Sequence, residues 1–236
     1  MAAPAATDRI ALLSGVPLFA DLSREEVARL AEMARTKRIR AREELCHKGD
    51  PGSQIYIIVT GRLKATTPSA DGKEMTFSIV GPGEVLGEMA LLDGGPRSAT
   101  VEALEACELL SIDRRDFLPF LEQHPRVAIK LLATLAGRIR TTSALVEDTL
   151  FLNLPNRLAK KLLELSDRYG RPTGEGIEIE LRLSQTELAN LVATTRESVN
   201  KQMRAWAEEG VAEMRSGRIL IRQVGTLEDL AEQIEE

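Results

Sequence analysis

Residues 125–150 carry a stripe of side chains at alternating spacings of three and four, and this segment constrains the fold most strongly. The stripe consists of Ile129, Leu132, Ala136, Ile139, Ser143, Val146 and Leu150. This period predicts one long α-helix with a seam of the coiled-coil type. Leu131, Leu135 and Leu145 form a second apolar set, so one face can cover a core while the other meets a partner. The pattern favours a parallel two-helix dimer over a helix packed wholly within its own subunit.

The segment before this helix, from about residue 39 to 118, has a sequence pattern typical of short β-strands. Apolar and β-branched runs lie at 54–59, 62–67, 75–80, 99–104 and 107–112. The turns between them contain glycine or proline, as at 49–52, Asp71-Gly72, 81–83 and 93–96. Short runs separated by such turns predict a small sandwich or roll of antiparallel strands. A helix within 17–36 precedes it, with a capping box formed by Ser23 and Glu26.

A break at Phe151 to Pro155 ends the long helix and predicts a hinge. Asn153 is suited to cap the next helix, at about 154–168, and proline is tolerated in a first helical turn. A Gly/Pro-rich loop (170–176) and a strand at 178–183 follow. Two further helices are then separated only by Leu191 to Ala193, and capping boxes open them at Ser184 and Thr194. We therefore expect domains at 1–124 and 153–236, joined by a helix and hinge at 125–152.

A helix, a tight break and a second helix are typical of the helix-turn-helix, whose second helix enters the major groove of DNA. The residues expected to face outward are Thr195, Arg196, Glu197, Ser198, Asn200, Lys201 and Arg204. Arginine and glutamate match the hydrogen-bonding edges of guanine and cytosine. A hairpin turning at Ser216-Gly217, with Arg215 and Arg218 beside the turn, is similar to the wing of winged helices, which lies along phosphates. The alternative is an ordinary helical pair with a solvated charged face.

A second group of polar residues lies between Gly87 and Thr100. Gly87 permits close approach of the backbone, and a helical turn that begins at Glu88 offers free amide hydrogens to an anion. Arg97 and Ser98 suit a singly charged phosphate, and Glu88 suits a sugar hydroxyl. The alternative is an internal ion pair between Glu88 and Arg97.

The segment LGEMALLDGGPRSATVEA resembles the phosphate-binding cassette of cyclic-nucleotide-binding domains. From about residue 16 to 224 the chain resembles the catabolite activator (CRP/FNR) family of bacterial transcription regulators. The resemblance implies an α+β fold with an N-terminal cyclic-nucleotide-binding β-roll of jelly-roll type, a long dimerisation helix and a C-terminal winged helix-turn-helix. It implies that Glu88 binds the ribose 2′-hydroxyl and that Arg97 and Ser98 bind the cyclic phosphate. Gly87 and Met89 complete the implied cassette.

Thr142 and Ser143 stand where the cyclic-AMP-responsive branch of this family contacts adenine. In that branch the threonine comes from the same subunit and the serine from the other. The resemblance therefore implies that both residues bind the ligand. The heptad count agrees with it, because that count independently puts Ser143 in the seam. The alternative for a polar residue in a seam is that it specifies the register of the two helices.

The implied DNA contacts are Thr195, Arg196, Glu197, Ser198, Lys201, Arg215 and Arg218. Arg196 and Glu197 match the family, but Lys201 replaces an arginine. Lysine cannot bind guanine through a planar fork, so we expect lower stringency at that base. Ala193 replaces a turn glycine of many members, a change that is tolerated where the backbone is not left-handed.

These features predict a homodimeric regulator gated by a cyclic nucleotide, with cyclic AMP favoured. It would bind a palindromic operator on double-stranded DNA and, by the family resemblance, RNA polymerase. One alternative is a cyclic GMP responder, since Thr142 and Ser143 could donate or accept at either purine. The other is a constitutive DNA binder whose cassette is filled by an internal ion pair.

Several other classes are excluded by what the sequence lacks. The net charge of −5 and pI near 5.4 give no global sign of nucleic-acid binding. The hypothesis that the chain binds DNA therefore depends on the local pattern of residues. Cys46 and Cys107 are too few for a disulfide framework, a zinc site or an iron–sulfur cluster. His47 and His124 are typical of exposed turn residues rather than haem ligands. We expect no enzyme, because no nucleophile–base pair or carboxylate dyad appears. The absence of a long apolar run or signal segment indicates a cytoplasmic protein without membrane contact.

Overall fold

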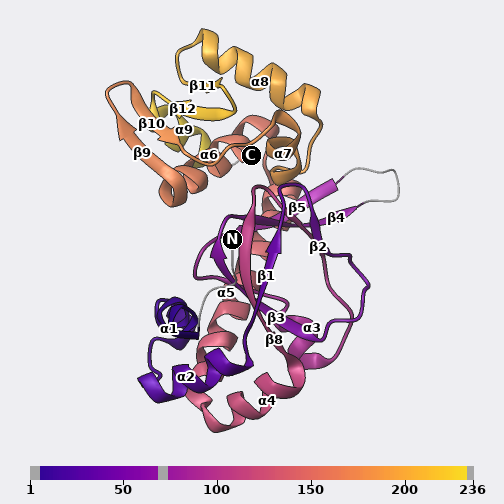
Figure 1. Cartoon of the computed structure of the whole chain (residues 1–236). Helices are drawn as coiled ribbons and strands as arrows, with labels where there is room; N and C mark the ends of the chain where they lie inside the picture. Colours follow the sequence, from indigo (N-terminus) through magenta and orange to yellow (C-terminus); the bar gives the residue numbers. More distant parts are fainter. Residues whose placement is uncertain (1–5, 69–73, 233–236) are drawn as a thin grey trace. The chain divides into compact units, whose positions relative to one another are not determined.

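A computed structural model describes residues 6–68 and 74–232 (Figure 1). Residues 6–67 and 77–140 belong to one compact unit, and residues 68, 74–76 and 141–232 belong to a second. The division falls inside the long helix, after Arg140, whereas the sequence predicted it near residue 152. The reason is that Val127 and Leu131 in the first half of this helix are buried in the core of the first unit.

Two four-stranded antiparallel sheets form the roll of the first unit. The first sheet has the order β1-β8-β3-β6, with strands Arg35–Ile39, Cys107–Asp113, Gln54–Thr60 and Val85–Leu86. The second has the order β2-β7-β4-β5, with strands Glu44–Cys46, Thr100–Ala103, Leu63–Pro68 and Glu74–Val80. The five predicted strands are present. The sequence missed β1, which is rich in charge, and β2 and β6, which are very short. The turn expected at Asp71-Gly72 lies outside the described residues.

Strand β3 reads as a continuous apolar run because it is covered on both sides. Tyr56 and Ile58 point into the core between the two sheets, where Leu109 is also buried. Ile55 and Ile57 point the other way, into a core shared with the helices. This alternation fixes the register of the strand that carries Gln54 and Tyr56 into the site described below.

The helices of the first unit are α1 (Ala6–Ser14), a short 3-10 turn (Pro17–Phe19), α2 (Arg24–Met33), α3 (Glu88–Asp93) and α4 (Arg114–Gln123). The capping box before α2 is confirmed, with Glu26 N donating to Ser23 Oγ at 3.2 Å. The helix expected over 17–36 is shorter, because strand β1 begins at Arg35. The expectation of an exposed His124 was wrong. Its side chain is only 12% exposed, lies 3.3 Å from Glu26 and packs on Phe120.

Helix α5 runs from Pro125 to Phe151 and is the longest described helix. The larger apolar members of the predicted seam are between 50% and 69% exposed: Ile129, Leu132, Ile139, Val146 and Leu150. Leu131 from the second apolar set is buried, and Leu135 and Leu145 are partly buried. The two stripes therefore differ in burial as the spacing predicted.

The second unit contains α6 (Leu154–Tyr169), α7 (Gln185–Leu191), α8 (Arg196–Glu208) and α9 (Val224–Glu232). Its sheet has the order β11-β12-β10-β9, with strands Ala212–Arg215, Arg218–Ile221, Gly176–Ile179 and Gly170–Thr173. Asn153 caps α6, as predicted. The segment 170–176, expected as a loop, instead contains β9 and its turn into β10. The strand expected over 178–183 ends at Ile179.

Candidate functional site

The first candidate site is built around Gly87. It follows strand β6, has φ +84° and stands directly before helix α3. A Cβ built at this position would lie 2.2 Å from Nη1 of Arg97 and 2.8 Å from the carbonyl oxygen of Gln54. Glycine is required here both for its positive φ and for the close approach of Arg97.

Arg97 is 6% exposed, and its guanidinium is held by neutral groups. Nη2 donates to the carbonyl oxygen of Gln54 at 2.9 Å, and Nη1 donates to that of Gly87 at 3.3 Å. The guanidinium carbon lies 5.3 Å from the ring centroid of Tyr56, a cation–π distance. Burial raises the pKa of Tyr56, partly offset by the charge of Arg97. Within 6–68 and 74–232, no carboxylate forms an ion pair with Arg97.

Glu88 does not pair with Arg97, so that alternative was wrong. Its side chain is 2% exposed, and Oε1 accepts a hydrogen bond from Nη1 of Arg138 on helix α5. Nη2 of Arg138 donates to the carbonyl oxygen of Val85 at 2.5 Å. Oε2 of Glu88 is buried and has no hydrogen-bond partner among the described residues. One carboxylate oxygen of the cassette is thus anchored, and the other is an unused acceptor.

Arg138 is the functional candidate that the sequence analysis missed. It continues the second stripe of α5, because residues 131, 135, 138, 142 and 145 are spaced four, three, four and three apart. A charged residue among leucines on a core-facing stripe was the signal that could have identified it.

Met89 and Ser98 lie at the exposed side of the cassette. The Met89 side chain is 46% exposed, and Ser98 Oγ lies 3.6 Å from its sulfur. A thioether is a weak acceptor, so the hydroxyl remains available for a stronger one. The structure therefore brings together Gly87, Glu88, Met89, Arg97 and Ser98.

Thr142 and Ser143 are exposed residues of helix α5. Thr142 lies one helical turn beyond Arg138, about 6 Å along the axis at 1.5 Å per residue. Ser143 lies on the exposed stripe, between Ile139 and Val146. The two hydroxyls therefore project from adjacent stripes of one helix.

Helix α8 presents the second candidate site. Val199, Met203 and Trp206 are buried, as expected. Of the residues expected to face outward, Thr195, Arg196, Glu197, Lys201 and Arg204 are exposed, whereas Ser198 and Asn200 are partly buried. The N-cap is Thr195 rather than Thr194, because Ser198 N donates to Thr195 Oγ1 at 3.2 Å. Glu197, Asn200, Lys201, Arg204, Ala205 and Glu208 line a shallow hollow on this face. In the described part of the chain, Arg196, Lys201 and Arg204 have no ion-pair partner.

Ala193 lies in the turn between α7 and α8 with φ +52°. The condition stated for its tolerance, that the backbone is not left-handed, is therefore not met. The turn keeps this geometry because the amides of Val192 and Thr194 both donate to the carbonyl oxygen of Ala189, at 3.2 and 3.1 Å.

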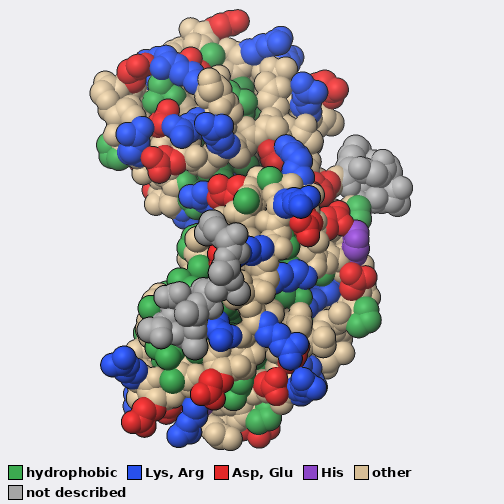
Figure 2. All heavy atoms as spheres, viewed as in Figure 1, with side chains coloured by type: hydrophobic (Ala, Val, Ile, Leu, Met, Phe, Trp, Pro, Cys, Tyr) green, Lys and Arg blue, Asp and Glu red, His purple; other side chains and the backbone are tan. Residues whose placement is uncertain are grey.

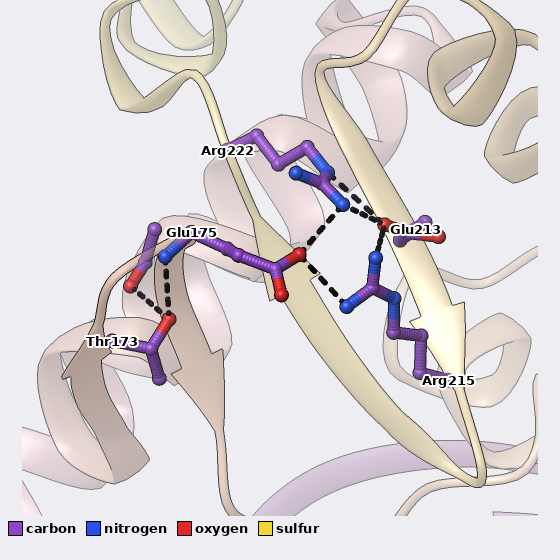
Figure 3. Close-up of polar contacts among 6 residues, drawn as sticks. Thr173, Glu175, Glu213, Arg215 and Arg222 are labelled. Carbon is purple, nitrogen blue, oxygen red and sulfur yellow. Dashed lines mark hydrogen bonds and ion pairs between the residues drawn. The ribbon is translucent and has the colours of Figure 1, made fainter.

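The wing hairpin turns at Ser216 and Gly217, both with positive φ, between β11 and β12. Arg215 is not free. Its Nη1 lies 2.9 Å from Glu175 Oε2, and its Nη2 lies 2.9 Å from Glu213 Oε1 (Figure 3). Arg218 is bonded to Glu178 at 3.0 Å. Both arginines expected at phosphates thus have carboxylate partners.

The chain matches the cyclic nucleotide-binding domain family over residues 36–124 and the Crp-like helix-turn-helix domain family over residues 156–230. It is 34% identical over 219 residues to the cyclic AMP receptor protein of Thermus thermophilus, covering 93% of this chain and 98% of that protein. It is 33% identical over 174 residues to a CRP-like cAMP-activated global transcriptional regulator of Mycobacterium tuberculosis, covering 74% and 78%. The solved structure of the c-di-GMP-responsive regulator CLP of Xanthomonas campestris shares the fold, with a TM-score of 0.76, 22% identity, and coverage of 84% and 99%.

A cyclic-nucleotide-binding roll and a helix-turn-helix in one chain define a ligand-responsive, DNA-binding transcription regulator. The chain belongs to the CRP/FNR family of these regulators. This is a family of regulators and not a class of enzymes. Among residues 6–68 and 74–232, no helix is both long enough and apolar enough to span a bilayer.

Proposed function

We propose that this protein is a homodimeric transcription regulator that binds cyclic AMP and then a palindromic operator. The observation that carries the ligand proposal is that Arg97 is buried without a carboxylate partner among the described residues. Arg97 is 6% exposed, and its guanidinium is bonded to uncharged carbonyl oxygens. An anion that replaces water at this site gains a charge-assisted hydrogen bond.

The cassette contains a group for each polar part of a cyclic nucleotide. Arg97 and the hydroxyl of Ser98 suit the cyclic phosphate. The unpartnered Oε2 of Glu88 suits the ribose hydroxyl, which is a donor, and its burial makes an unmade bond costly. The names of the curated relatives, which mention cyclic AMP, support this choice of nucleotide.

Thr142 and Ser143 are the candidates for the purine. Thr142 is on the stripe of Arg138, whose side chain reaches Glu88. Ser143 is on the exposed stripe, so it would come from the second subunit of a dimer. Adenine offers both donors and acceptors, and hydroxyls can serve either. This arrangement would make the ligand a link between subunits.

The exposed stripe of α5 is proposed to pair with the same stripe of a second copy. Five large apolar side chains that are at least half exposed along one helix are a surface that water disfavours. The heptad spacing suits a parallel two-helix seam. A two-fold dimer would present two α8 helices, which suits half-sites about one helical turn apart. By family resemblance the bound dimer would contact RNA polymerase.

One observation favours a second candidate, a constitutive DNA binder. The ion pair between Arg138 and Glu88 already occupies part of the cassette. Calorimetry with cyclic AMP, with cyclic GMP and with buffer alone, each followed by an operator-binding assay, separates these functions. We expect binding of cyclic AMP and operator affinity that requires it. Preferential binding of cyclic GMP would identify cyclic GMP as the ligand in place of cyclic AMP. Operator binding without nucleotide would favour the constitutive function.

A further inference from the structure

The wing of the second unit carries equal numbers of positive and negative side chains on the face of its sheet that lies away from the core. Strand register explains this grouping, since Glu213, Leu220 and Glu178 are directly opposite one another on β11, β12 and β10. The ion-paired set contains four arginines and four glutamates, so its net charge is zero: Arg171, Arg215, Arg218, Arg222, Glu175, Glu178, Glu180 and Glu213. In Figure 2, basic and acidic side chains are interspersed on the visible face of this unit.

Four of these residues, Glu175, Glu213, Arg215 and Arg222, form a closed ring of alternating charge, which we name the wing ring (Figure 3). Glu175 Oε2 lies 2.9 Å from both Arg215 Nη1 and Arg222 Nη2. Glu213 Oε1 lies 2.9 Å from Arg215 Nη2 and 2.8 Å from Arg222 Nη2. Each carboxylate therefore bridges both guanidiniums, as a phosphate would.

The turn between β9 and β10 places Glu175 in the ring. Thr173 Oγ1 accepts from the amide of Glu175 at 3.3 Å and donates to the carbonyl oxygen of Gly176 at 2.8 Å. Gly176 has φ +139°, and a Cβ there would lie 2.0 Å from the carbonyl oxygen of Ile221. The turn thus approaches the end of β12, next to Arg222, as closely as a glycine allows.

The charges in the ring perturb one another in the expected directions. Hydrogen bonds from Arg222 and then Arg215 lower the pKa of Glu213. Hydrogen bonds to Glu213 and then Glu175 raise the pKa of Arg215. The lowered pKa of Glu213 favours its charged form, which holds both arginines of the ring.

Helix α8 is different, because Arg196, Lys201 and Arg204 have no ion-pair partner in the described part of the chain. Free cations attract any DNA backbone, and each phosphate that they neutralise releases counterions. A cation that already has a carboxylate partner must first exchange it, so it gains little from a phosphate. The two sets of cations in the same unit therefore differ in what a phosphate can gain.

We propose that the carboxylates of Glu175 and Glu213 bind Arg215 and Arg222 in the way that DNA phosphates would. By holding these two arginines, they limit the sequence-independent affinity of the protein for DNA. They are specificity-determining residues that need not touch DNA. This inference rests on the proposed binding of DNA by the winged helix-turn-helix. Its consequence is that Arg215 and Arg222 bind the DNA backbone only when a phosphate replaces their carboxylate partners.

The test compares the full chain with the double variant Glu175→Gln/Glu213→Gln on a duplex of random sequence. Fluorescence anisotropy gives the affinity at salt concentrations from about 50 to 200 mM, and thus the salt slope. We expect about tenfold tighter binding at the lowest salt and a slope steeper by about one to two. Glu228→Gln/Asp229→Asn is the matched control, because it also removes two negative charges, here from exposed positions on α9. Its affinity should stay within about twofold of the unsubstituted chain.

A further variant separates release of the arginines from a general loss of negative charge. Adding Arg215→Ala and Arg222→Ala to the double variant should abolish the gain. A gain that persists without these arginines, or a double variant that behaves like Glu228→Gln/Asp229→Asn, overturns the inference. If the double variant fails to unfold cooperatively on heating, the single substitution Glu175→Gln in the exposed turn is tested by the same criteria. If the unsubstituted chain binds no duplex at any salt, with or without cyclic AMP, the proposed function itself fails and this inference falls with it.

Discussion

The guanidinium of Arg138 donates to the buried carboxylate of Glu88, which lies fifty residues earlier in the sequence. The pair joins helix α5 to the cassette within the first unit. Removing only the arginine would leave a buried, uncompensated charge. We expect Arg138→Met to lower the free energy of unfolding by about 2 kcal/mol, less than for a fully buried pair because Arg138 is partly exposed.

The double variant Arg138→Met/Glu88→Gln should recover part of that loss, since the amide carries no charge. Urea denaturation of the two single variants and the double variant gives the coupling energy of the pair. Additive effects would mean that the ion pair contributes nothing specific to the stability of the first unit.

Arg97→Leu removes the buried charge that faces the proposed phosphate. We expect affinity for cyclic AMP to fall by at least about a hundredfold, because a charge-assisted bond in a buried site is lost. Titration calorimetry measures the affinity, and thermal unfolding checks that the fold survives. Arg24→Leu, on the exposed surface of α2, is the same chemical change away from the cassette and should bind normally. Unchanged binding by the Arg97 variant would place the pocket elsewhere.

Ser143→Ala tests whether the ligand links two subunits. Loss of this hydroxyl should reduce the stimulation of operator binding by cyclic AMP more than it reduces dimerisation, because the ligand favours only the competent state. Sedimentation and operator titration provide the two readouts. Thr149→Ala on the same helix is the control, since its hydroxyl donates to the carbonyl oxygen of Leu145. A dimer that binds operator equally well with and without nucleotide would rule out this gating.

Ala193→Gly should stabilise the second unit by about 0.5 to 1 kcal/mol, because alanine at φ +52° is strained and glycine is not. The comparison is Ala205→Gly inside helix α8, which should destabilise by about 1 kcal/mol. Chemical denaturation of both variants measures the difference. The same sign for both substitutions would show that the turn stores no strain.

Glu197→Ala should relax discrimination at one base pair per half-site by about 1–3 kcal/mol. The reason is that Glu197 is exposed in the first turn of α8, the end that enters the major groove in this type of domain. Selection from a random-sequence pool, before and after the substitution, gives the base preference. Glu208→Ala at the far end of the helix should keep the original preference. Recovery of asymmetric or unspaced sites would contradict the palindromic operator.

Local pattern determined most of the architecture, because it depends on periodicity and on nearest neighbours in the chain. The spacing in 125–150 predicted both stripes of α5, and capping side chains located the starts of α2, α6 and α7. The glycine and arginine of the cassette were also recognisable, since Gly87, Glu88, Arg97 and Ser98 lie within one short segment.

Only the tertiary structure decided which charges meet. Glu88 pairs with Arg138 rather than with Arg97, because helix α5 brings its inward stripe to the cassette, and no local rule encodes that contact. Arg215 looked free in the sequence, whereas sheet register places Glu175 and Glu213 beside it. The left-handed φ at Ala193 is imposed by two amides that converge on Ala189 and not by the preference of alanine. Partners of buried and paired charges depend on long-range packing, which periodicity cannot supply.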